Sequence, residues 1–136
     1  LDTIDFGCIR PPLKNGSSAR YWVIYESLCH LIERYQVNVL SVESQFIQKN
    51  VQSAFKLGMA KGCALVAAGR FQLPVFEYTP TKAKLAVVGT GKASKYQVQS
   101  MVQHRLKLAK PPTPEDAADA LALAICHIQN FKQPNH

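Results

Sequence analysis

Two aspartates three residues apart, Asp116 and Asp119, are the side chains in this sequence best suited to metal chemistry. Three residues of an α-helix turn through about 300°, so both carboxylates lie on one face, one turn apart. The segment predicts a helix start, with Thr113 as N-cap and Pro114 at the first helical position. The stretch AADALALAI around Asp119 predicts a buried helix, and a buried carboxylate is costly unless it is paired or binds a metal. The alternative is that both acids cap and solvate the helix end.

A third acid, Glu43, closes the segment VNVLSVE, which is β-branched and apolar and predicts a strand covered on both faces. Sites in α/β sheets gather at the carboxyl ends of strands, so Glu43 is well placed to meet Asp116 and Asp119. Three converging carboxylates are hard oxygen ligands, which select Mg²⁺ or Mn²⁺. Taken alone, Glu43 is better explained as an exposed acid that begins a loop.

The charge balance favours a polyanionic partner. Sixteen Lys and Arg stand against nine Asp and Glu, a net charge of +7, yet three of the nine acids fall between positions 115 and 119. Nuclease sites have this layout because cationic surface holds phosphates while carboxylates hold the metal. A capped helix on a basic protein without such a partner gives the same pattern.

Length and composition indicate one globular domain over residues 1–136, with 47% hydrophobic and 18% charged residues. The sequence contains no apolar run of about 18 residues, the length that would predict a membrane-spanning helix. The widely spaced cysteines form no zinc pattern and suggest free thiols in a reducing cytoplasm. They are Cys8, Cys29, Cys63 and Cys126.

Strand-like and helical segments alternate along the chain, which indicates an α/β sheet with crossover helices. The expected strands cover residues 3–10, 37–43 and 74–78, and the expected helices cover residues 18–36, 51–69, 80–88 and 94–108 and the segment from 114 onward.

Other residues could contact nucleic acid. Phe46, in a polar loop, could anchor that loop to the core or stack on an unpaired base. Lys84 and Lys95 flank the Gly89–Gly91 turn, where they are either solvated surface charges or phosphate ligands. The GTGK sequence at 89–92 is not a P-loop, because Ala occupies both position 86 and position 93.

Three segments resemble the RuvC family of bacterial Holliday-junction resolvases: VESQFIQKNVQSAFKLGMAKG, PVFEYTPTKAKLAVVGTGKASKYQVQSMV and EDAADALALAICH. The similarity covers nearly the whole chain in order. It implies an α/β, RNase H-like fold with a mixed sheet flanked by helices. It also implies a homodimeric endonuclease that cuts four-way DNA junctions in recombination and repair, with the RuvA–RuvB branch-migration complex as a partner and no membrane association.

The resemblance also assigns residues. It makes Glu43, Asp116 and Asp119 catalytic metal ligands, with two Mg²⁺ ions per active site that Mn²⁺ can replace. It makes Phe46 the base-contacting aromatic, and Lys84 and Lys95 the DNA-binding lysines.

One departure is serious. The family begins with a strand carrying a G-[IL]-D-P-G motif, whose Asp is the first metal ligand, and nothing here matches it. LDTIDFGCIR resembles the family's third strand, so Asp2 and Asp5 lie in the wrong element to replace that ligand. We therefore expect an N-terminally incomplete copy that lacks two strands and is inactive by itself. A non-catalytic junction-binding module remains the main alternative, and an RNase H-like enzyme acting on another nucleic acid is a weaker one.

Overall fold

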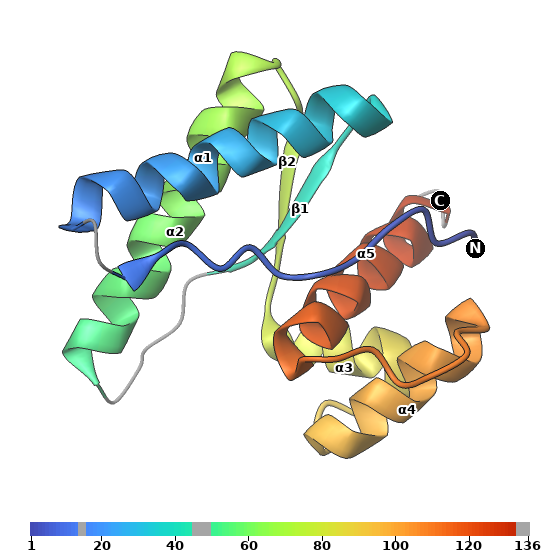
Figure 1. Cartoon of the computed structure of the whole chain (residues 1–136). Helices are drawn as coiled ribbons and strands as arrows, with labels where there is room; N and C mark the ends of the chain where they lie inside the picture. The colour runs from blue at the N-terminus through green and yellow to red at the C-terminus, as the bar shows by residue number, and fades with distance from the viewer. Residues whose placement is uncertain (14–15, 45–49, 133–136) are drawn as a thin grey trace. The chain divides into compact units, whose positions relative to one another are not determined.

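The computed structural model describes residues 1–13, 16–44 and 50–132, and within them the chain forms five α-helices and two short strands (Figure 1). In chain order these are α1 (Gly16–Tyr35), β1 (Leu40–Glu43), α2 (Val51–Arg70), β2 (Val75–Tyr78), α3 (Pro80–Val88), α4 (Lys95–Leu106) and α5 (Glu115–Lys132). Among the helices so described, none has the length and apolar content needed to cross a membrane.

Local signals set most of the helix boundaries. The Thr79 hydroxyl accepts a hydrogen bond from Lys82 N at 3.1 Å at the start of α3. Ser94 and Gln97 form a reciprocal capping box at the start of α4. Gly89 ends α3 with a φ of 92°, a left-handed conformation that favours glycine. These starts and this stop agree with the sequence prediction.

The two strands pair in parallel. Leu40 N donates to Pro74 O at 3.0 Å and Ser44 N donates to Tyr78 O at 2.9 Å, so the acceptor advances along β2 as the donor advances along β1. Parallel strands need a crossover connection, and α2 is the helix between them in the chain. This parallel pair with its crossover helix agrees with the α/β fold class predicted from the sequence.

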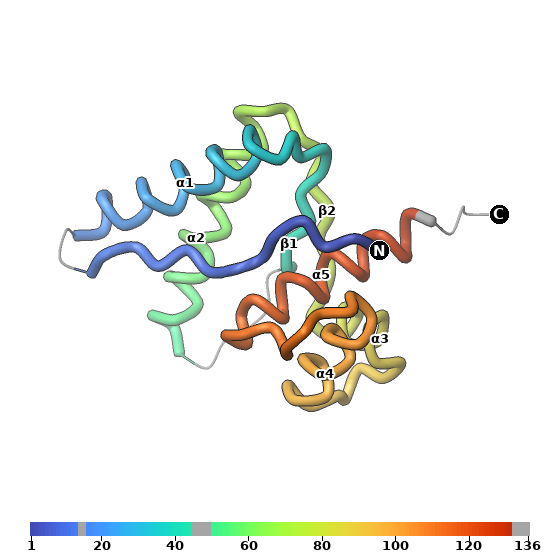
Figure 2. The backbone as a smooth tube through the Cα atoms, turned by 45° about the vertical axis from the view of Figure 1, so that its right-hand side comes forward, coloured from blue at the N-terminus to red at the C-terminus, as the bar shows by residue number. Residues whose placement is uncertain are grey.

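The chain divides into two compact units. One comprises Leu1–Cys8, Ser41–Ser44 and Glu77–His136, and the other comprises Ile9–Leu40 and Gln45–Phe76. In the first, α3, α4 and α5 lie side by side in both views (Figures 1 and 2) around a core that includes Val87, Val102 and Ile125. In the second, α1 and α2 pack through Cys29, Ile32 and Ala67. The single RNase H-like domain expected over residues 1–136 stays a prediction.

Two sequence expectations are wrong. Residues 3–10 form no strand, because a strand exists only when paired, and the strands in the described part of the chain, β1 and β2, pair with each other. The last helix begins at Glu115, one residue later than the predicted start. The Pro114 carbonyl accepts from Ala118 N at 3.4 Å, so Pro114 rather than Thr113 is the N-cap.

Candidate metal and nucleic-acid site

Helix α5 presents the two predicted aspartates on its exposed side. Its buried face is formed by Ala117, Ala118 and Leu121 and continues one turn further on. Asp116 and Asp119 fall outside this stripe and are exposed. The expectation that Asp119 is a buried residue is therefore wrong, because the apolar stripe is narrower than the run of Ala and Leu residues suggested. Exposure leaves both carboxylates accessible to a ligand.

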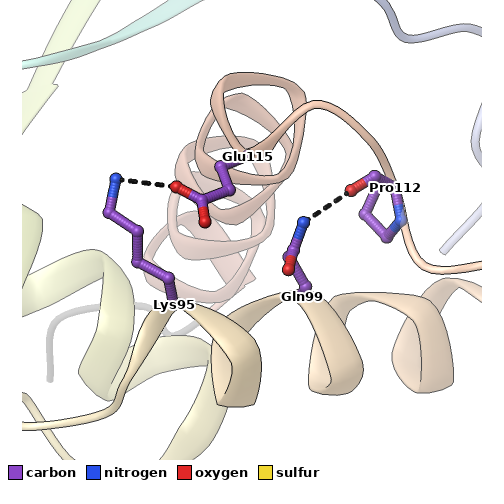
Figure 3. Close-up of polar contacts among 4 residues, drawn as sticks. All are labelled: Lys95, Gln99, Pro112 and Glu115. Carbon is purple, nitrogen blue, oxygen red and sulfur yellow. Dashed lines mark hydrogen bonds and ion pairs between the residues drawn. The ribbon is translucent and has the colours of Figure 1, made fainter.

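Two lysines lie beside these acids. Lys95 is the first residue of α4, and its Nζ lies 3.2 Å from Glu115 Oε2 (Figure 3). The same ammonium interacts electrostatically with Asp119 and Asp116. Half-buried Lys84, on α3, also acts on Asp119. Three helices thus bring together the acids and lysines that the sequence had singled out separately.

The neighbouring charges on α3, α4 and α5 shift the pKa of Asp119 and of Lys95. The pKa of the Asp119 carboxyl is raised, chiefly because its surroundings partly desolvate it, and nearby Asp116 and Glu115 add to the effect while Lys95 and Lys84 oppose it. The pKa of Lys95 is raised, chiefly by its hydrogen bond with Glu115. The ionised form of Asp119 is thus held at a cost that a bound cation would relieve.

The start of α4 is fastened to the segment that leads into α5. Gln99 Nε2 donates to Pro112 O at 3.2 Å (Figure 3), and Pro112 is buried. Sequence reasoning missed Gln99, and it missed Glu115 as the partner of Lys95. The only available signal was the position of Glu115 in the first turn of the predicted helix.

Glu43 is exposed at the end of β1, as its strand-end position predicted. Within residues 1–13, 16–44 and 50–132, no three Asp, Glu, His or Cys side chains lie close enough to hold a metal ion. The described structure therefore brings Asp116 and Asp119 together without completing a three-carboxylate site with Glu43. Phe46, the predicted base-stacking residue, lies outside the described residues.

The side-chain atoms available to bind a metal nevertheless favour particular ions. The paired ligands on α5 are carboxylate oxygens, the donors that Mg²⁺ and Mn²⁺ prefer, and the four cysteines are free. An α/β fold that holds paired carboxylates beside lysines is typical of metal-dependent enzymes acting on phosphodiesters.

Comparisons with known proteins identify the family. Residues 1–127 match the sequence model of the family described as "Crossover junction endodeoxyribonuclease RuvC". The protein of that name from Protochlamydia amoebophila is 60% identical over 126 residues, which cover 93% of this chain and 75% of that protein. The one from Hydrogenovibrio crunogenus is 48% identical over 124 residues, or 91% of this chain and 71% of that protein.

Solved structures agree. Thermus thermophilus RuvC in complex with a Holliday-junction substrate is similar with a TM-score of 0.86 and 32% identity, covering 91% of this chain and 75% of that one. The T. thermophilus RuvC structure gives a TM-score of 0.82 at the same identity. The chain belongs to the RuvC family of crossover junction endodeoxyribonucleases, and its fold is RNase H-like. The fold and family predicted from the sequence are confirmed.

Proposed function

We propose that this chain acts in a metal-dependent, structure-selective endonuclease that cuts four-way DNA junctions during recombination and repair. The family match over residues 1–127 and the crossover-junction endodeoxyribonuclease names of its relatives support this activity. The observation in the structure that carries it is the meeting of Asp116 and Asp119 with Lys84 and Lys95. A site that handles a phosphodiester needs both kinds of charge: anions for a metal and cations for the DNA backbone.

We assign metal binding to Asp116 and Asp119. We also propose Glu43 as a third ligand, on the basis of its place at the end of β1 and the family resemblance, and it would have to move closer to the two aspartates than the described structure brings it. Their oxygen donors fit Mg²⁺, with Mn²⁺ as a substitute, and two ions per site suit phosphodiester hydrolysis. When bound, the metal supplies stabilisation of the negative charge that develops at the scissile phosphate. The carboxylates act as ligands and do not attack phosphorus.

The other site residues act on the DNA. Lys95 and Lys84 are proposed to contact phosphate oxygens, and each such contact strengthens binding in a salt-dependent way. Phe46 is proposed to stack on an unpaired base, an interaction worth about 1–3 kcal/mol.

We also propose that the protein acts as a homodimer in the cytoplasm, with RuvA–RuvB as a partner complex. The surface of α2 supports self-association, because it exposes a series of large apolar side chains. They are Val51, Phe55, Leu57, Met59, Leu65 and Val66.

A cleavage assay separates this function from its rivals. The protein as its gene encodes it is incubated with a four-way junction, a duplex of the same sequence and an RNA–DNA hybrid, each with Mg²⁺, Mn²⁺ or EDTA. We expect cutting of the junction alone and only with metal. Junction binding without cutting in either metal would identify the non-catalytic module, which the names of the relatives do not favour. Preferential cutting of the hybrid would identify a different RNase H-like enzyme.

A further inference from the structure

Two contacts fasten one face of α4 to the segment that begins α5. Lys95 and Gln99 are one helical turn apart and therefore lie on the same side of α4. Lys95 pairs with Glu115 at 3.2 Å, and Gln99 donates to the Pro112 carbonyl at 3.2 Å (Figure 3). The earlier residue of α4, Lys95, contacts the later partner, and Gln99 contacts the earlier one, so the two segments run antiparallel at this point. Two such contacts fix both the distance between α4 and the start of α5 and their register.

The pair between Lys95 and Glu115 contributes little to folding stability. Their side chains are 62% and 53% exposed, and exposed pairs contribute about 0–1 kcal/mol. Its location is what distinguishes it. Glu115 directly precedes Asp116 and lies one turn before Asp119, so a lysine held by Glu115 is held beside both proposed metal ligands.

Without that partner, the Lys95 ammonium would lose its hydrogen bond, keep only the electrostatic attraction to Asp119 and Asp116, and sample more positions. Its four-carbon stem has several rotatable bonds, and ordering such a side chain costs up to about 2 kcal/mol. The backbone of α4 is held independently by the Ser94 capping box and by Gln99. Loss of Glu115 would therefore free the head of Lys95 while leaving its helix in place.

We propose that Glu115 is a positioning residue: it holds the Lys95 ammonium beside Asp116 and Asp119, ready to contact a phosphate. This inference rests on the proposed nuclease function and adds a residue to it. Glu115 itself is not assigned to the metal or to the DNA.

The test replaces Glu115 by Gln, which keeps the size of the side chain and removes its charge. With saturating Mg²⁺, kcat for junction cleavage is expected to fall about 2–5-fold, the effect of losing about 0.4–1 kcal/mol, which is the upper part of the range for an exposed ion pair. KM should change by no more than about twofold, because removing an acid near a polyanion favours binding and offsets the weaker phosphate contact of Lys95. Glu33→Gln, an equally conservative change at an exposed acid of α1, is the control and should leave kcat unchanged.

A double-mutant cycle with Lys95→Gln assigns the effect. If Glu115 acts through Lys95, Glu115→Gln will not lower kcat further in the Lys95→Gln background. In EDTA, each single change should shift Tm by no more than about 3 °C, because Glu115→Gln loses the pair with Lys95 but also removes a repulsion with Asp119, and the two shifts should not add if the residues pair. This coupling in Tm tests the pairing without any cleavage.

The outcomes separate the two proposals. If Lys95→Gln lowers kcat and Glu115→Gln does not, the positioning role is wrong and the nuclease function stands. A rise in kcat for Glu115→Gln would show that Glu115 restrains Lys95, which also overturns the inference. If neither change has an effect on kcat, the proposed role of Lys95 in the nuclease is wrong. If the wild-type protein does not cut, additive Tm changes overturn the pairing and coupled ones support it.

Discussion

Replacing Asp119 by Asn should stabilise the metal-free protein and at the same time remove its metal-dependent cleavage. Partial desolvation raises the pKa of Asp119 above its ordinary value. A carboxyl whose pKa is higher in the folded state contributes stability below its ordinary pKa and loses that contribution as the pH rises through the raised pKa. Above the raised pKa, the ionised carboxylate of Asp119 opposes folding.

The size of the gain depends first on the desolvation of the Asp119 carboxylate and then on its charged neighbours. Asp116 precedes it by three residues and Glu115 by four, and like charges at these helical spacings destabilise by about 0.2–0.5 kcal/mol each. Asn removes the desolvation cost, which is the largest effect, and both repulsions, but it also loses the attraction to Lys95, which exceeds either repulsion, and the attraction to Lys84. A net gain near 0.5 kcal/mol is expected, which corresponds to an increase in Tm of about 1–3 °C.

Thermal unfolding in EDTA measures this gain. The difference in Tm between Asp119→Asn and wild type should shrink from pH 7 towards pH 4, as wild-type Asp119 takes up its proton. With Mg²⁺, cleavage should fall by more than about 100-fold, because loss of a direct ligand should cost at least as much as loss of an outer-shell partner. Junction binding in EDTA should be unchanged or tighter.

Asp2→Asn, at an exposed acid of the same unit, is the matched control and should alter neither Tm nor cleavage. A lower Tm for Asp119→Asn at pH 7 in EDTA would show that its attractions exceed its repulsions, contrary to this reasoning. Retained metal-dependent cleavage would remove Asp119 from the metal site.

Three further changes test other parts of the molecule. Lys84→Ala should reduce the log–log salt dependence of junction binding by about 0.9, the value of one phosphate contact on duplex DNA, and an unchanged slope would make it an ordinary surface charge. Phe46→Ala should weaken cleavage with a near-normal Tm, because the sequence around it, SQFIQKN, is mostly polar, whereas a large fall in Tm would place it in the core. Tyr78→Phe removes the buried 2.6 Å hydrogen bond to His127 Nδ1 and should destabilise the fold by about 1–3 kcal/mol in chemical unfolding. Exposed Tyr96→Phe is its control, and equal effects of the two changes would argue against a stabilising Tyr78–His127 bond.

The helices were predictable because their boundaries depend on local chemistry. Thr79, Ser94 and Gly89 act on backbone groups only a few residues away, so their effect is visible in a short window of sequence. A strand depends instead on a partner that is distant in the chain. For VFEY the partner is β1, whereas TIDFGCIR has a similar composition and forms no strand in the described structure.

The candidate site was predictable to the extent that it depends on residue type. Asp116 and Asp119 share a helix, so their spacing alone placed them together. The pairing of Lys95 with Glu115 was not predictable in the same way, because the two residues belong to different helices and meet only when α4 packs on α5. Exposure of Asp119 was missed for a related reason: the width of a buried stripe is set by the neighbouring helices.

The proposed function explains why the site combines carboxylates with lysines. Before metal binds, Asp119 is opposed by partial desolvation and by two acids, and Lys95 and Lys84 offset part of that cost. A bound divalent cation would take over this compensation, because its charge is larger and closer to the carboxylates. The lysines would then be available to the phosphates of the DNA. Lys95 and Lys84 would therefore stabilise the ionised carboxylates in the free protein and bind the DNA backbone in the complex. This double role explains why they lie beside the carboxylates.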